Sequence, residues 1–107
     1  LYKAAESGVS AANYLETCLR IDRTDSSIAR QALDELLEYL NIAAVPVTLK
    51  QMQIARQANL CYGKNSGHAA GLNFGDCFAY ALAKEQNAPL LFKGNDFTHT
   101  NVKQVKI

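Results

Sequence analysis

The chain has 107 residues, 49% of them hydrophobic, and its 11 Lys and Arg offset its 10 Asp and Glu to leave a net charge of +1. This length supports one domain with a single core, and the composition excludes a disordered chain. The near-zero charge excludes attraction of nucleic acid by the field of the whole chain, so a local patch would have to bind it.

The first half of the chain predicts two helices between two short strands. Ser10 caps the first helix and either Asp25 or Ser26 caps the second, because each offers a side-chain oxygen to the first helical turn. Apolar residues recur on one face of both helices. Pro46 ends the pairing of the second strand, since it has no N–H to donate. In chain order these elements are a brief strand ending at Val9, a helix at 11–22, a helix running to about Leu40 and a strand at 42–47.

The second half predicts two helices, a strand and a further short strand. Thr48 and Gln51 form a capping box for the first of these helices, and Gly63 ends it. A loop of small and polar residues at 64–71 follows, and Asn73 caps the next helix. The predicted elements are helices at 49–62 and 74–87, a strand at 89–92, a turn at 93–97 and a strand at 102–107. This alternation of helix and strand predicts an α/β sandwich with a mainly parallel sheet.

Three cysteines form no CxxC pair, and Cys18 and Cys77 stand in apolar helical contexts typical of small core residues in a reducing compartment. No apolar run reaches the roughly 20 residues needed to span a bilayer. These features predict a soluble cytoplasmic domain.

Asp76 is the most informative residue of the chain. With Asn73 as the cap, Asp76 is the third helical residue, where the positive end of the helix dipole favours the ionised carboxylate. Phe74, Cys77 and Phe78 surround it with apolar side chains, so this helix is expected to be largely buried. A charge that enters a buried helix needs a cation, a metal or a hydrogen-bond network as its partner.

Two further acids follow candidate strand ends: Glu16 comes after the strand at Val9, and Asp96 comes after the strand at 89–92. Ligands of open α/β sheets bind outside the carboxyl ends of the strands. Oxygen ligands converging there suit Mg²⁺ or Mn²⁺, and such an ion activates water and stabilises charge on a phosphodiester. The spacing alone is weakly specific, since acids near strand ends are common, and a lone helical Glu such as Glu16 is also typical of a solvated face.

Four stretches closely resemble the PIN-domain ribonuclease toxins of the VapC type. The most specific are GLNFGDCFAYALA at 71–83 and PLLFKGNDF at 89–97. SAANYLE at 10–16 matches the family's Ser-Ala-x-x-x-x-Glu segment, and YGKNSGH at 62–68 is similar to a family loop, with Ala69 where Pro is usual. The resemblance covers essentially the whole chain.

This resemblance implies a PIN-domain-like three-layer sandwich, in which a mainly parallel sheet between helices carries an acidic metal pocket at its carboxyl edge. Glu16, Asp76 and Asp96 would be three of the four pocket acids. Asp76 and Asp96 would hold Mg²⁺ or Mn²⁺, and Glu16 would complete the acidic cage and help position water. The reaction would be endonucleolytic cleavage of structured RNA, commonly tRNA. The resemblance also implies a homodimer and a cognate antitoxin whose tail fills the pocket.

Four residues are candidates for contact with RNA: Lys64, His68, Lys93 and Asn95. The lysines lie in pocket-facing segments and could contact phosphates, although an ordinary solvated charge is equally compatible with each. His68 is considered as a general acid or base, because the unperturbed pKa of histidine in general lies near neutrality. Metal-assisted phosphodiester chemistry does not require a histidine, so a loop contact is favoured over catalysis. Asn95 is a turn former that could also orient Asp96.

The chain departs from the family pattern at two places. The family begins with a strand that carries an Asp and a helix, and neither occurs here. The chain is therefore expected to be an N-terminally truncated single PIN-like domain at 1–107, lacking the first strand and its pocket Asp. Asn101 stands where many relatives have Asp, and its lack of charge argues against a metal role there.

Two other functions compete with the ribonuclease hypothesis. One is a PIN-like module that has lost catalysis and binds RNA or protein, but nothing structural demands the three retained acids. The other is a phosphoacceptor domain of the receiver type, which needs an acceptor Asp at a strand end followed by Thr or Ser and Lys at later strand ends. The chain shows no convincing set of that kind.

For residues 1–107 alone we expect little or no RNA cleavage and weak metal affinity, because the first pocket Asp is expected to be missing. Isothermal titration with Mn²⁺ measures this directly. A tight Mn²⁺ site in this chain by itself would contradict the expectation.

Overall fold

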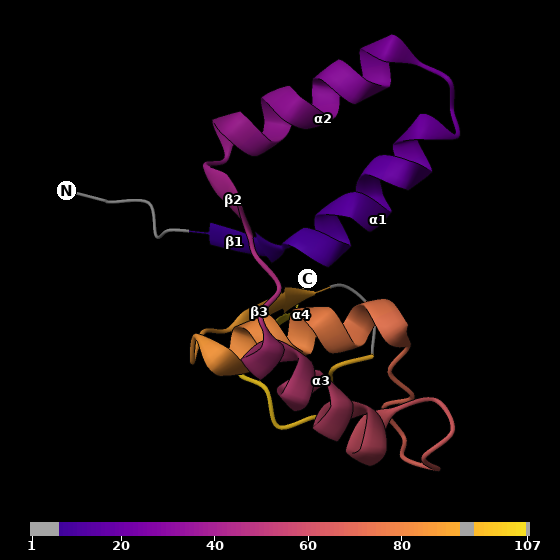
Figure 1. The fold of residues 1–107 in the computed structure, drawn as a ribbon, viewed down its shortest axis with the longest axis vertical. Helices are drawn as coiled ribbons and strands as arrows, with labels where there is room; N and C mark the ends of the chain where they lie inside the picture. Colours follow the sequence, from indigo (N-terminus) through magenta and orange to yellow (C-terminus); the bar gives the residue numbers. More distant parts are fainter. Residues whose placement is uncertain (1–6, 93–95, 107) are drawn as a thin grey trace, which may run out of the picture. The chain divides into compact units, whose positions relative to one another are not determined.

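The computed structural model describes residues 7–92 and 96–106 (Figure 1). The chain divides into two compact units, one ending at Pro46 and the other beginning at Val47. The single-domain organisation expected from the sequence stays a prediction. The described elements are β1 (Ser7–Ser10), α1 (Ala11–Asp22), α2 (Ser27–Tyr39), β2 (Ile42–Val45), α3 (Leu49–Tyr62), α4 (Phe74–Glu85), β3 (Leu90–Phe92) and β4 (Gln104–Lys106).

In the first unit, β1 and β2 form a parallel pair. Their register runs from Ser7 opposite Ile42 to Ser10 opposite Val45. Ser10 is buried at the end of β1 and caps α1, because its Oγ accepts a hydrogen bond from the backbone N of Ala12 at 3.3 Å. The predicted strand, cap and helix are confirmed here.

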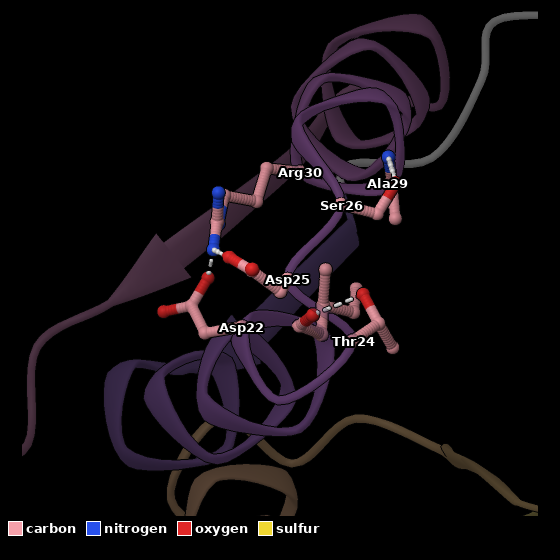
Figure 2. Close-up of polar contacts among 7 residues, drawn as sticks. Asp22, Thr24, Asp25, Ser26, Ala29 and Arg30 are labelled. Atoms are coloured by element: carbon pink, nitrogen blue, oxygen red, sulfur yellow. Dashed lines mark hydrogen bonds and ion pairs between the residues drawn. The ribbon is translucent and has the colours of Figure 1, made fainter.

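The turn between α1 and α2 is fastened by polar side chains (Figure 2). Ser26 caps α2 by accepting from the backbone N of Ala29 at 3.1 Å. Arg30 lies 3.0 Å from the Asp22 carboxylate and 3.7 Å from that of Asp25, so Asp25 forms an ion pair and does not cap the helix. These pairs are exposed, and each is worth at most about 1 kcal/mol.

The helices of the first unit contain no fully buried residue among those that the structure describes. Ile28, in the predicted apolar stripe of α2, is 80% exposed, and Leu36 is also exposed. Cys18, predicted as a core residue, is half-buried.

The second unit carries the buried core. There α3 and α4 pack against each other, and β3 pairs with β4 in parallel, from Leu90 opposite Gln104 to Phe92 opposite Lys106 (Figure 1). Small side chains on both helices permit their close approach. The hydrophobic core cluster contains Ala55, Ala58, Ala70, Leu72, Cys77, Tyr80, Ala81, Ala83, Phe92, Phe97 and Val102.

A buried polar contact also joins α3 to α4. The side chain of Gln51 is 1% exposed, and its Nε2 donates to the Glu85 carboxylate at 2.9 Å. Thr48 caps α3 by accepting from the backbone N of Gln51 at 3.2 Å. Only this half of the predicted capping box is confirmed, since the Gln51 side chain reaches across to α4. The tertiary contact satisfies an amide donor that would otherwise be buried without a partner.

The α/β fold class and the parallel strand pairing predicted from the sequence are confirmed. Among the described residues, no helix is both long enough and apolar enough to cross a membrane.

Replacing Glu85 with Ala should lower the free energy of unfolding by about 1–3 kcal/mol, because the buried Gln51 amide loses its acceptor. The Gln31–Glu35 pair on α2 is a matched control, since it has the same chemistry at 2.9 Å but is exposed. Urea denaturation of both variants measures the difference. Equal losses for Glu85→Ala and Glu35→Ala would show that burial of the contact contributes nothing.

Candidate active site

The N-terminus of α4 is held by a complete capping box. The Asn73 side chain accepts from the backbone N of Asp76 at 2.9 Å, and the Asp76 carboxylate accepts from the backbone N of Asn73 at 3.1 Å. The sequence predicts the Asn73 cap, and the structure adds the reciprocal bond. Two donors that the helix leaves unsatisfied are thereby paired, and the Asp76 side chain is fixed in position.

Asp76 is half-buried at the positive end of the helix dipole, a position that favours its ionised form. The prediction that this helix is largely buried is confirmed at Cys77, Tyr80, Ala81, Leu82 and Ala83. Phe74 differs, since its side chain is 82% exposed. Phe74 is the first residue of α4, and its ring packs edge-on against Phe78 with a centroid distance of 4.9 Å. Cys77 is buried as predicted.

Asp96 follows the carboxyl end of β3, as predicted. A short turn at 86–89 leads from α4 into β3, which packs against the helix, so the start of α4 and the end of β3 lie toward the same side of this unit (Figure 1). Asp96 itself is exposed, but the next residue, Phe97, is buried against Phe92 with ring centroids 5.4 Å apart. Residues 93–95 separate Asp96 from β3 and lie outside the described residues, so the meeting of Asp76 and Asp96 in one pocket stays a prediction.

Glu16 lies on the exposed part of α1, in the first unit. Within residues 7–92 and 96–106, no group of three His, Cys, Asp or Glu side chains is arranged to hold a metal ion. The role of Glu16 in a shared pocket stays a prediction.

Lys64 is placed by a closed loop. Leu72 N donates to the Tyr62 carbonyl at 2.7 Å and Lys64 N donates to the Leu72 carbonyl at 3.0 Å, which ties the two ends of the loop together. Gly63 ends α3 where a Cβ would lie 2.4 Å from the carbonyl oxygen of Asn59, so no larger residue fits without a shift of the backbone. Lys64 is exposed beside Asn73 in the wall of one cavity.

His68 is exposed and supports this same loop. Its Nδ1 accepts from the backbone N of Ala70 at 3.0 Å, so in the neutral ring Nε2 carries the proton. Its ring lies edge-on to Tyr62 at a centroid distance of 4.9 Å. Contact of His68 with RNA stays a prediction. Lys93 and Asn95 lie outside the described residues.

Asn101 has a hydrogen-bond partner, distant in the chain, that the sequence does not reveal. The hydroxyl of Tyr80 donates to the Asn101 side-chain oxygen, which joins α4 to the segment before β4. Burial raises the pKa of Tyr80, so the phenol stays protonated and able to donate. The absence of charge at this position is therefore compatible with a structural role.

Cys77 is buried beside Asp76. Desolvation, assisted by the negative charge of Asp76, raises the pKa of the Cys77 thiol. The neutral thiol acts as a small apolar residue rather than a nucleophile. Because the unfolded thiol deprotonates at lower pH, the stability that Cys77 contributes falls as the pH rises above the ordinary thiol range.

A cavity of about 740 Å³ adjoins the capping box, and sequence reasoning missed part of its wall. Met52, Arg56, Asn59 and Leu60 line it from α3. The last three follow Met52 by four, seven and eight residues, which places all four on one helical face. This spacing can be read from the sequence.

A family model for the PIN domain matches residues 1–103. The chain belongs to the PIN-domain family.

Three relatives from Mycobacterium tuberculosis are similar over most of their length. The chain is 49% identical to Ribonuclease VapC28 over 96 residues, which cover 90% of this chain and 72% of the relative. It is 42% identical to Ribonuclease VapC42 over 103 residues, covering 96% and 79%. It is 44% identical to Ribonuclease VapC30 over 99 residues, covering 92% and 75%. The resemblance to VapC-type PIN domains predicted from the motifs is confirmed.

In this PIN domain, Asn73→Ala should lower the free energy of unfolding by about 1 kcal/mol, because the first turn of α4 loses its cap. Asn65→Ala is the control, since Asn65 is an exposed residue of the neighbouring loop. Thermal unfolding of the two variants measures the difference. No loss for Asn73→Ala beyond that of Asn65→Ala would contradict the capping role.

Proposed function

We propose that this PIN-domain protein is a metal-dependent endoribonuclease toxin of the VapC type. The observation that carries the proposal is the carboxylate of Asp76, which a capping box holds at the start of α4. We propose that Asp96, which follows β3, meets Asp76 in one pocket. The similarity to VapC ribonucleases supports RNA as the substrate.

Asp76 and Asp96 fit Mg²⁺ or Mn²⁺ chemically, because carboxylate oxygens are the ligands that these ions prefer. Asp76 is the better fixed of the two, since the Asn73 backbone N holds its Oδ2. Glu16 is the third acid that we propose for the site. When bound, the ion would activate a water molecule and stabilise the charge that develops on the scissile phosphodiester.

The residues of the chain have separate tasks in this proposal. Asp76 and Asp96 supply negative charge that holds the cation, and the α4 N-terminus keeps Asp76 ionised. Lys64 is placed to contact an RNA phosphate, as a positive charge near the same helix start. We further propose a structured, tRNA-like substrate, action in the cytoplasm, a homodimer, and an antitoxin partner that blocks the acidic edge.

The test is cleavage of total tRNA by the natural full-length protein in Mn²⁺, compared with its Asp76→Asn variant. Asn retains an oxygen that can accept from the Asn73 N–H, so the cap is kept while the charge is removed. We expect activity to fall by at least about a hundredfold, the upper end of what losing an outer-shell partner of a metal costs.

Asp34→Asn is the matched control, because Asp34 is an exposed acid of α2 outside the proposed site. Equal cleavage by Asp76→Asn and wild type would refute the catalytic role of Asp76. RNA binding by a wild-type protein that cleaves nothing would instead support the inactive PIN-like module.

A further inference from the structure

The cavity beside the capping box has a buried apolar lining. Its volume of about 740 Å³ lies within the range of small-ligand pockets, which is roughly 300–1,000 Å³. The lining comes from α3, from α4 and from the loop that joins them. Ala55, Leu72 and Cys77 are its buried members, and all three are apolar. Such a lining accommodates a flat, weakly polar group better than an ion.

The exposed part of the lining is cationic. Arg56 and Lys64 both contribute to it, and none of the described residues that line the cavity is Asp or Glu. Within the described part of the chain, neither cation forms an ion pair with a carboxylate. Asn59 and Asn65 add amide groups that can donate or accept hydrogen bonds. The charge of this opening is therefore complementary to an anion that carries an apolar body.

Phe74 provides an aromatic surface at the same opening. It lines the cavity although its side chain is 82% exposed, and it is supported edge-on by Phe78. Unpaired bases of RNA stack on exposed aromatic side chains and on the guanidinium plane of Arg. Phe74 and Arg56 supply both kinds of group to one cavity.

Asn73 connects this cavity to the acid at the start of α4. It lines the cavity, and its backbone N and side chain form the two hydrogen bonds of the capping box with Asp76. An RNA strand that brings a phosphodiester to Asp76 therefore passes the opening of the cavity.

We propose that this cavity receives an unpaired base of the RNA, from a nucleotide next to the one whose phosphodiester lies at Asp76. Phe74 stacks on the base, and Arg56 and Lys64 contact the adjoining phosphates. The inference rests on the proposed ribonuclease function and deepens it, because it makes recognition of a single-stranded or flipped-out nucleotide a requirement of the site.

An apolar protein segment is the competing occupant. Such a segment would cover Arg56 and Lys64 and remove both charges from water. None of the described residues that line the cavity offers a carboxylate to pair with them, so burying these charges is costly in free energy. RNA supplies the missing anions with its phosphates. The charge of the lining therefore favours RNA over a protein helix or a second copy of this chain.

The experiment measures binding without cleavage, using the natural full-length protein in EDTA. The probe is a fluorescein-labelled single-stranded RNA pool of randomised sequence, about ten nucleotides long, followed by fluorescence anisotropy. We expect Phe74→Ala and Arg56→Ala each to weaken binding by at least about fivefold, because the first loses the stacking of one base and the second loses a phosphate contact. A fully paired RNA duplex should bind less tightly than the pool, and the two substitutions should change its affinity less.

Two matched controls should bind the pool as wild type does. Tyr39→Ala removes an aromatic ring of α2 that is 85% exposed, and Lys50→Ala removes an exposed cation of α3 that does not line the cavity. Unchanged affinity of Phe74→Ala and Arg56→Ala overturns the proposal. A dimer that dissociates in Phe74→Ala while RNA affinity stays constant also overturns it, and assigns the cavity to a second copy.

Cleavage in Mn²⁺, measured separately, distinguishes this proposal from the one on which it rests. In one outcome, cleavage requires Asp76 but the cavity variants bind RNA as wild type does. This result supports the ribonuclease proposal and refutes the base pocket. In the other outcome, the wild-type protein cleaves no RNA but both cavity variants bind RNA more weakly than it does. This result refutes the ribonuclease proposal and supports an RNA-binding cavity.

Discussion

The reciprocal hydrogen bonds between Asn73 and Asp76 are the contact around which the second unit is organised. They fix the start of α4, and α4 packs against both α3 and β3. The same bonds restrict the Asp76 carboxylate at the end of the helix where a negative charge is most favourable. One local motif therefore both starts a buried helix and fixes the acid that we propose for the metal site.

Acidic and basic side chains occupy different places around the start of α4. Asp76 lies at the start of α4 and Asp96 follows β3, and we propose both for the metal, whereas Arg56 and Lys64 line a cavity formed by α3, α4 and the connecting loop. In the proposed function, neighbouring surfaces of the same unit would bind a cation and a polyanion. A nuclease that uses a metal needs this arrangement, because its acids repel the phosphates that its substrate must bring close.

Hydrogen bonds close the loop that carries Lys64 and His68. Backbone hydrogen bonds join its two ends, and His68 accepts from the backbone N of Ala70. Gly71, with φ of +59°, adopts a left-handed conformation that leads the chain into Leu72 and the cap. Because functional residues are often carried on loops placed by a rigid scaffold, this closure links the fold to the proposed contact with RNA.

The sequence by itself determined the helices, the Ser10 and Asn73 caps and the parallel strands, because these depend on local capping chemistry and on the periodicity of apolar residues. The family followed from the resemblance of its motifs. Only the tertiary structure decided that Gln51 pairs with Glu85 and that Tyr80 donates to Asn101, since both contacts join residues far apart in the chain. It also decided that Phe74 is exposed. Periodicity shows which residues share a helical face, but only the packing of a second helix shows which part of that face stays in water.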